Sequence, residues 1–113
     1  MSSRDDRVPS IIAQLAAAFL LERANPDPLI TVTRARVSPD RRRATIYVSV
    51  FPDSREADAL TFLARTGGEF RTYTKQHAAL TRIPHFDFSL DPAERERRAL
   101  DALKLDASPE QES

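Results

Sequence analysis

The sequence contains no cysteine, which excludes disulfides, thiolate chemistry and most structural zinc sites. Its two glycines are the adjacent pair Gly67 and Gly68, and a single pair cannot form a glycine-rich phosphate-binding loop. The longest apolar run, residues 11–21, is interrupted by Gln14 and is too short to span a membrane. The first six residues lack the composition of a signal or transit peptide. These absences lead us to expect a cytoplasmic protein that makes no contact with a membrane.

The chain length of 113 residues favours one compact domain. A domain of this size buries roughly 65% of the surface that its unfolded chain exposes, which is enough for one modest core. The final residues are polar, and we expect them to be disordered. The predicted organisation is therefore a single domain over residues 1–105, followed by a short tail over residues 106–113.

Charge is unevenly distributed along the chain, although 17 basic and 17 acidic residues sum to zero. Residues 1–30 carry a net charge of −1, residues 31–86 one of +5 and residues 87–113 one of −4. A basic middle segment can attract a polyanion even when the whole chain is neutral, so nucleic acid is a candidate partner. The acidic C-terminus suggests the hypothesis that residues 92–105 cover part of the sheet or helix surface and screen the basic region.

The first half of the chain predicts one helix and two strands. Apolar residues recur at helical spacing over residues 8–23, with Pro9 in the first turn. Residues 29–37 are rich in Thr and Val, and residues 44–51 alternate apolar and polar side chains, as in a half-buried strand. The polar turn over residues 38–43 predicts that the two strands form an antiparallel hairpin.

The second half predicts a bent helix and a third strand. An aspartate or serine at positions 53–54 is expected to cap the helix, and the pair at 67–68 should end or bend it, giving helix, kink, helix. Residues 83–90 have the pattern of a strand, after which Asp91 caps a short charged helix. The order of elements predicts an α+β domain, with a three-stranded sheet and helices packed on one face.

Short motifs occur in a specific order along this pattern. In the first half they are Arg7-Val8, Thr31-Val32-Thr33, Val37-Ser38-Pro39-Asp40 and Ala44-Thr45-Ile46-Tyr47-Val48-Ser49-Val50. In the second half they are Gly68-Glu69-Phe70-Arg71, Arg82-Ile83-Pro84 and Phe86-Asp87-Phe88-Ser89-Leu90-Asp91. Each motif alone is common, but their order and spacing over about residues 7–100 resemble the ribosome-binding factor A family.

The resemblance implies a KH-like type II fold and binding to the immature small ribosomal subunit, with a role in processing the 5′ end of the 16S rRNA and a link to growth in the cold. Family members usually replace the GxxG loop of KH domains with an Ala-x-Gly kink, and the matching positions here are Thr66, Gly67 and Gly68. Thr66 can bend a helix by bonding back to the preceding turn. The implied partners are the small-subunit precursor, its rRNA and ribosomal proteins. No cofactor or bound metal is implied, and we expect the protein to be a monomer.

Cations near the glycine pair form the first candidate set for RNA binding: Arg65, Arg71, Lys75 and Arg82. Arg71 and Lys75 are four residues apart and share a helix face, and a glycine lets an RNA backbone approach closely. The alternative interpretation is a solvated helix face beside a helix-breaking pair. Because both side chains are expected to be exposed, replacing either should change stability by no more than about 0.5 kcal/mol.

A second candidate set lies on the predicted hairpin: Arg41, Arg42 and Arg43 in the turn, with Arg34 and Arg36 on the first strand. Arg34 and Arg36 are two residues apart and therefore share a strand face. The turn arginines can hold phosphates or can keep a sheet edge soluble, and both interpretations stay open. Tyr47 is the aromatic residue best placed to stack on a base, whereas the phenylalanines occupy apolar positions typical of a core.

Catalysis has little support in the sequence. His77 and His85 are isolated, and Asp87 and Asp91 near His85 do not by themselves define a metal or acid–base site. We therefore predict a non-enzymatic protein that binds RNA in ribosome assembly. The alternative is a KH-like protein-interaction adaptor that uses its arginines to dock an acidic partner.

Overall fold

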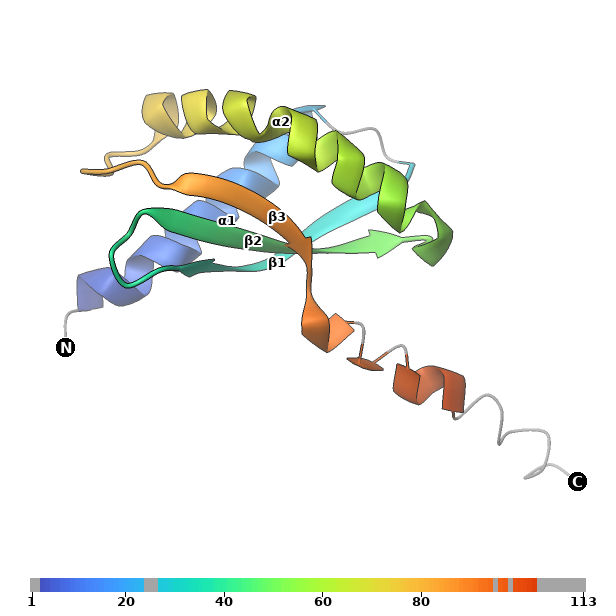
Figure 1. The fold of residues 1–113 in the computed structure, drawn as a ribbon. Coiled ribbons are helices and arrows are strands. Elements are labelled where there is room, and N and C mark those ends of the chain that lie inside the picture. Colours follow the sequence, from blue (N-terminus) through green and yellow to red (C-terminus); the bar gives the residue numbers. More distant parts are fainter. Residues whose placement is uncertain (1–2, 24–26, 95, 98, 104–113) are drawn as a thin grey trace, which may run out of the picture.

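The computed structural model describes residues 3–23, 27–94, 96–97 and 99–103 (Figure 1). Its elements in chain order are α1 (Ser3–Arg23), β1 (Leu29–Val37), β2 (Arg43–Phe51), a 3₁₀ turn (Asp53–Arg55), α2 (Glu56–His77) and β3 (His85–Leu90). This arrangement confirms the predicted α+β class with a three-stranded sheet.

The sheet has the order β1-β2-β3, so β2 is central. β1 and β2 form the predicted antiparallel hairpin, and β3 pairs with β2 in parallel. Parallel neighbours need a crossover connection, and α2 supplies it. Alternate side chains of β2 are buried, as the sequence alternation predicted: Ala44, Ile46, Val48 and Val50.

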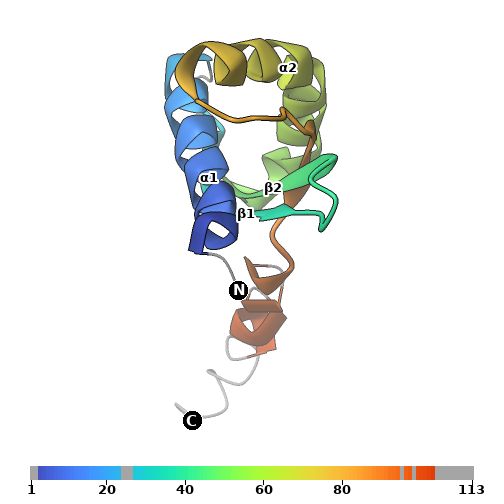
Figure 2. The same ribbon diagram turned by 90° about the vertical axis from the view of Figure 1, so that its left-hand side faces the viewer.

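Both helices pack on the buried face of the sheet, α1 over β1 and α2 along β3 (Figures 1 and 2). Phe19 of α1 and Phe70 of α2 are fully buried, with ring centroids 5.2 Å apart. Phe70 also packs against Phe86 of β3, at a centroid distance of 4.6 Å. One core therefore joins both helices to the sheet, and the predicted packing role of these aromatic residues is confirmed.

α1 begins at Ser3, five residues before its predicted start. Pro9 consequently lies inside the helix rather than in its first turn. The φ of proline is compatible with a helix, but proline removes one backbone hydrogen bond, so Pro9 is a local cost within a helix that continues on both sides of it. Ile12, Ala16 and Phe19 form the buried stripe of α1.

α2 continues through Gly67 and Gly68 without a break, and neither glycine has a positive φ. The ribbon of α2 changes direction along its length (Figure 2), and the helix continues through the glycines instead of ending there. The predicted cap at positions 53–54 is wrong, because these residues belong to the 3₁₀ turn. The N-cap of α2 is Arg55, which makes no side-chain capping bond.

β3 starts at His85, two residues later than predicted. The carbonyl groups of Ile83 and Pro84 accept hydrogen bonds from Arg71 of α2, so they are held toward the helix. After β3, the carboxylate of Asp91 accepts a hydrogen bond from the N–H of Ala93 at 2.9 Å, which confirms the predicted helix cap.

The described residues between 92 and 103 lead away from the sheet and helices (Figure 1). Leu100 and Leu103 are exposed. The hypothesis that residues 92–105 cover the basic region is therefore wrong for the part of this segment that the structure describes. The predicted tail, residues 106–113, lies outside the described residues.

Candidate functional site

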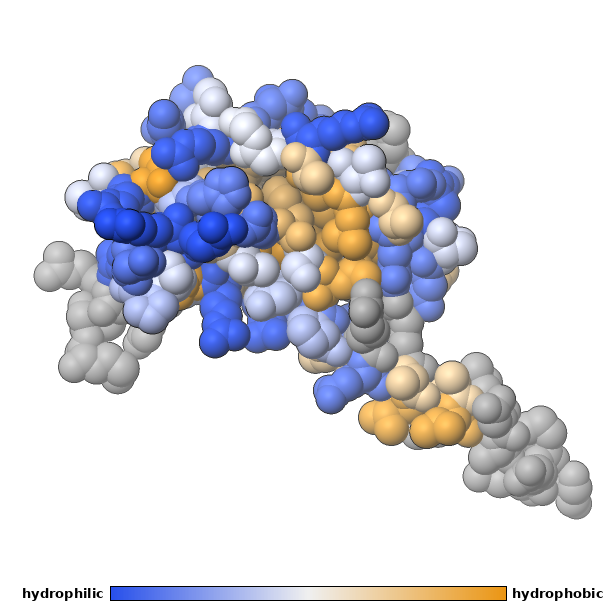
Figure 3. Space-filling model, in the orientation of Figure 1, coloured by the Kyte–Doolittle hydropathy of each residue, from blue (hydrophilic) through white to orange (hydrophobic). Residues whose placement is uncertain are grey.

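The hairpin turn and the loop before β3 meet at one end of the sheet. The backbone N–H of His85 donates to the carbonyl oxygen of Arg42 at 2.8 Å and joins the turn to the loop that carries Arg82. We call residues 38–43 and 80–85 together the basic end. They contain four arginines and one aspartate, a net formal charge of +3. Figure 3 shows hydrophilic side chains gathered there, at the left of the view.

The hairpin turn is held by its own polar groups. Ser38 Oγ donates to Asp40 Oδ1 at 2.7 Å, and the N–H of Arg42 donates to the same oxygen at 3.0 Å. The Ser38 hydroxyl is the main cause that holds the pKa of the Asp40 carboxyl below its usual value. Arg41 adopts the left-handed conformation, with φ of 61°. The turn therefore presents its exposed arginines from a fixed backbone.

Cations from two chain segments face one hollow at the basic end. Arg41 and Arg82 line this hollow, whose volume is about 220 Å³. Asp87 of β3 partly offsets the charge, since it accepts a hydrogen bond from Arg43 at 3.1 Å and lies 3.4 Å from His85 Nε2. The basic end therefore retains a surplus of positive charge around a concave surface, which suits a polyanion.

A groove of about 340 Å³ runs from the basic end between α2 and β3. It is lined by Leu60, Leu63, Ala64, Gly67, Gly68, Arg71, His85, Phe86, Asp87 and Phe88. Figure 3 shows apolar side chains exposed between α2 and β3, where this groove lies. A β-carbon added at either glycine would meet no atom within 4 Å. A ligand can therefore approach the backbone of α2 closely at the glycine pair.

The structure separates the members of the first candidate set. Arg71 Nη1 donates to the carbonyl oxygens of Ile83 at 3.0 Å and Pro84 at 2.8 Å, so it fastens the loop before β3 to α2. Arg65 is exposed, but it lies six residues before Arg71, about 120° away around an ideal helix, and it does not line the groove. Lys75 is exposed one turn beyond Arg71.

Thr66, the first residue of the predicted kink, makes a hydrogen bond within α2. It is buried, and its Oγ1 donates to the carbonyl oxygen of Leu63 at 3.0 Å. A threonine that bonds back in this way favours a bend, as the sequence suggested. Thr66 therefore helps to shape α2, while the glycines that follow line the groove.

Arg34 and Arg36 lie on the open face of the sheet, which is the face away from the helices. The guanidinium of Arg34 lies over the ring of Tyr47, 4.5 Å from its centroid, and its Nε is 3.4 Å from Asp91 Oδ2. Arg34 thus covers one face of the aromatic ring that the sequence offered for base stacking. Arg36 is exposed on the same face of the sheet.

Asp91 forms a buried contact across the sheet that sequence reasoning missed. Its side chain accepts a hydrogen bond from Thr33 Oγ1 at 2.6 Å, and the residue is only 6% exposed. The register between β1 and β2 shifts between Val32 and Arg34, which leaves Thr33 as the extra residue of a bulge. The Thr33 hydroxyl is the main cause of a pKa of Asp91 below its usual value. Strand alternation gives no signal for such a bulge.

The described residues contain no group of three or more metal-ligating side chains. None of the described helices is long and apolar enough to cross a membrane. His77 stacks on Tyr73 at a centroid distance of 4.0 Å, and His85 pairs with Asp87, so each histidine has a local partner. The features that the structure brings together are the basic end and the adjoining groove.

The sequence matches the family model for ribosome-binding factor A over residues 4–104. It is 34% identical over 110 residues to ribosome-binding factor A of Saccharopolyspora erythraea, a match that covers 94% of this chain and 66% of that protein. The crystal structure of ribosome-binding factor A from Thermus thermophilus matches with a TM-score of 0.68 at 22% identity, over 75% of this chain and 93% of that one. A Thermus thermophilus model fitted into the cryo-EM map of a 30S–ribosome-binding factor A complex matches with a TM-score of 0.65 at 22% identity. This match covers 74% of this chain and 91% of that one.

These structures share the KH-like type II fold, which confirms the fold expected from the motifs. The family match extends through both helices and all three strands of the described chain. The chain belongs to the ribosome-binding factor A family.

Proposed function

We propose that this chain binds the immature small ribosomal subunit through its rRNA and assists maturation of the 16S rRNA 5′ end. The basic end contacts backbone phosphates, and the groove between α2 and β3 receives a single-stranded segment beside Gly67 and Gly68. The protein acts by binding and not by catalysis, and it acts in the cytoplasm, where subunits are assembled.

The observation that carries this proposal is the hydrogen bond from His85 to Arg42. It joins the turn to the loop that carries Arg82, so that Arg41 and Arg82 line one hollow. His85, the donor of this bond, also lines the neighbouring groove, whose wall contains two glycines. Arginines against phosphates supply most of the affinity of an RNA contact, and close backbone approach sets its register. The Thermus thermophilus relative fitted into a 30S complex supports the small subunit as the partner.

Binding can promote maturation only if the protein prefers one rRNA conformation over another. A binder shifts a conformational equilibrium by its difference in affinity between the two states. We therefore propose that the basic end and groove fit the precursor geometry better than the mature one, so that the protein leaves as maturation is completed.

Sedimentation of the tagged protein through a sucrose gradient of cell lysate tests the proposal, with precursor and mature 16S rRNA probed in each fraction. We expect the protein to migrate with small subunits that are enriched in precursor rRNA. The double variant Arg42→Ala/Arg82→Ala should move toward the top of the gradient, whereas the control Arg65→Ala should stay with the subunits. A wild-type protein that remains at the top in low salt would contradict the proposal and favour the adaptor alternative.

A further inference from the structure

The end of the sheet opposite the basic end has the reverse charge. β1 begins there, β2 ends there and α2 begins there (Figure 1). We call residues 27–30 and 51–58 the acidic end. They contain four carboxylates and one arginine, a net formal charge of −3. Because the two ends of the sheet carry opposite charge, RNA phosphates that are attracted to the basic end would be repelled by the acidic end.

Two exposed apolar side chains accompany this charge. Leu29 and Phe51 are register partners on β1 and β2, and they are 54% and 71% exposed. Leu21, near the end of α1, is 87% exposed. Neighbouring apolar side chains rimmed by polar residues are typical of a surface that contacts another macromolecule. Since Leu29 and Phe51 contribute little to the core, they are available for contact with a partner.

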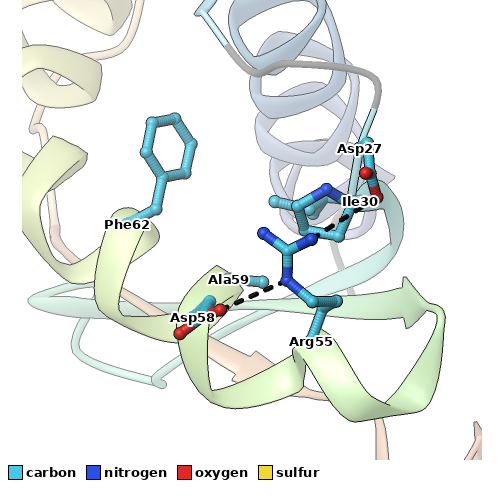
Figure 4. A pocket seen from close by; sticks show the side chains of 7 residues that line it. Asp27, Ile30, Arg55, Asp58, Ala59 and Phe62 are labelled. Atoms are coloured by element: carbon cyan, nitrogen blue, oxygen red, sulfur yellow. Dashed lines mark hydrogen bonds and ion pairs between the residues drawn. The ribbon is translucent and has the colours of Figure 1, made fainter.

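The acidic end also contains a hollow of about 170 Å³, shown in Figure 4. Arg55 lies at its edge, with Nη1 3.6 Å from Asp27 Oδ1 and Nε 3.2 Å from Asp58 Oδ2. These ion pairs connect the entry of β1 to the first turn of α2. The remaining lining is apolar: Pro28, Ile30, Ala59 and Phe62. The hollow is therefore preformed, with an apolar interior and a rim that is negative overall.

We infer that the acidic end docks a basic protein segment, one in which lysine or arginine side chains alternate with apolar ones. Leu29 and Phe51 lie on the open face of the sheet, whereas Ile30 lines the hollow on the face toward α2. The segment would therefore cross the end of the sheet, covering Leu29 and Phe51 on one face and entering the hollow on the other, while its cations meet the carboxylates. Charge complementarity selects a basic protein over RNA or an anionic membrane surface. The inference rests on the proposed function, because the segment belongs to a protein of the same small-subunit particle. The chain then contacts rRNA with one end and protein with the other.

The test compares two probes, purified precursor small subunits with their proteins and the rRNA extracted from the same particles. Phe51→Ser removes the exposed ring, and Asp58→Lys reverses one charge on the rim. We expect each to weaken binding to the particles about tenfold, the effect of losing a central interface contact, and to leave binding to the extracted rRNA within about twofold. Leu103→Ser is the matched control, because Leu103 is 64% exposed but lies outside the acidic end.

A second measurement does not depend on a destabilising substitution. A photo-crosslinking amino acid placed at the position of Phe51 should join the chain to a protein of the purified particle, whereas one placed at Arg42 should join it to rRNA. Equal loss of binding to both probes, unchanged binding to particles, or a crosslink from position 51 to rRNA would each overturn the inference. Failure of the wild-type chain to bind the particles would instead overturn the proposed function on which it rests.

Discussion

At the scale of single residues, Arg71 binds the loop before β3 to α2. Its two hydrogen bonds to the carbonyl groups of Ile83 and Pro84 come from a charged donor. We expect Arg71→Ala to lower the free energy of unfolding by about 1 kcal/mol, because those carbonyl groups lose their partner. The limit of about 0.5 kcal/mol expected from the sequence therefore does not hold for Arg71. Lys75→Ala should change the free energy of unfolding by less than about 0.5 kcal/mol. Urea denaturation of both variants checks this, and equal stabilities would contradict the role given to Arg71.

Asp91 gives the protein a specific dependence of stability on pH. The Thr33 hydroxyl, assisted by Arg34 and the N–H of Ala93, holds the pKa of Asp91 below its usual value. A carboxyl with a lowered pKa in the folded state adds stability above its unfolded pKa of about 3.9, and that stability is lost as the pH falls through the folded pKa. The contribution is therefore present at neutral pH and disappears in acid.

We expect Asp91→Asn to destabilise the fold by about 1–2 kcal/mol at pH 7, since it replaces a carboxylate that accepts hydrogen bonds within the sheet. The difference from the wild type should begin to shrink below about pH 4, because the carboxyl of the unfolded wild-type chain is protonated first, and it should continue to shrink as the pH falls toward the lower pKa of the folded state. Thermal unfolding midpoints measured from pH 7 to pH 3 check this. A difference that stays constant over that range would show that the charge of Asp91 does not matter.

At the scale of elements, the function proposed above gives α2 a conflict between stability and RNA binding at its glycine pair. Gly67 and Gly68 are helical, have no positive φ and leave room for a β-carbon. Alanine is the better helix former by about 0.5–1 kcal/mol per position, so Gly67→Ala/Gly68→Ala should raise the thermal unfolding midpoint. The same change narrows the groove and should weaken binding to a 16S rRNA fragment, measured by fluorescence anisotropy. If stability rises but RNA binding is unchanged, RNA does not contact α2 at the glycine pair.

The elements that the sequence predicts well are those with a local periodic signal. Alternation along β2 is visible in the sequence and confirmed by burial from Ala44 to Val50. The bend in α2 was also foreseen, because glycine pairs and a back-bonding threonine act within one turn of helix. Helix ends were predicted less well, since the 3₁₀ turn before α2 and the extra turns of α1 have no comparable signal.

The contacts that assemble the candidate site are not local, and the sequence alone did not reveal them. The hydrogen bond between His85 and Arg42 joins residues 43 positions apart, and that between Thr33 and Asp91 joins residues 58 positions apart. The first depends on the pairing of β3 with β2, and the second depends in addition on the bulge in β1. Sequence reasoning identified most of the cations. It could not say that Arg71 and Arg34 are engaged within the fold while Arg82 joins the hairpin turn.

At the scale of the whole molecule, net neutrality conceals two ends of opposite charge. Binding at the basic end alone should release counterions in proportion to the phosphates contacted. We expect Arg42→Ala and Arg82→Ala each to lower the slope of log affinity against log salt concentration by about one, on an rRNA fragment. Arg65→Ala, which faces away from the groove, should leave the slope unchanged. If all three variants share one slope, phosphate contacts at the basic end are excluded.

The parallel pairing of β3 with β2 has a consequence for the order of events during synthesis. The hairpin, with Arg41 and Arg42 in its turn and Arg43 at the start of β2, is complete by Phe51, but neither the groove nor the loop carrying Arg82 exists until residues 56–90 have left the ribosome and folded. Pairings between distant segments form late, after the intervening chain has been ordered. A nascent or truncated chain therefore carries positive charge without the site proposed here, and on that proposal only a chain that has completed its fold can compete for a maturing subunit.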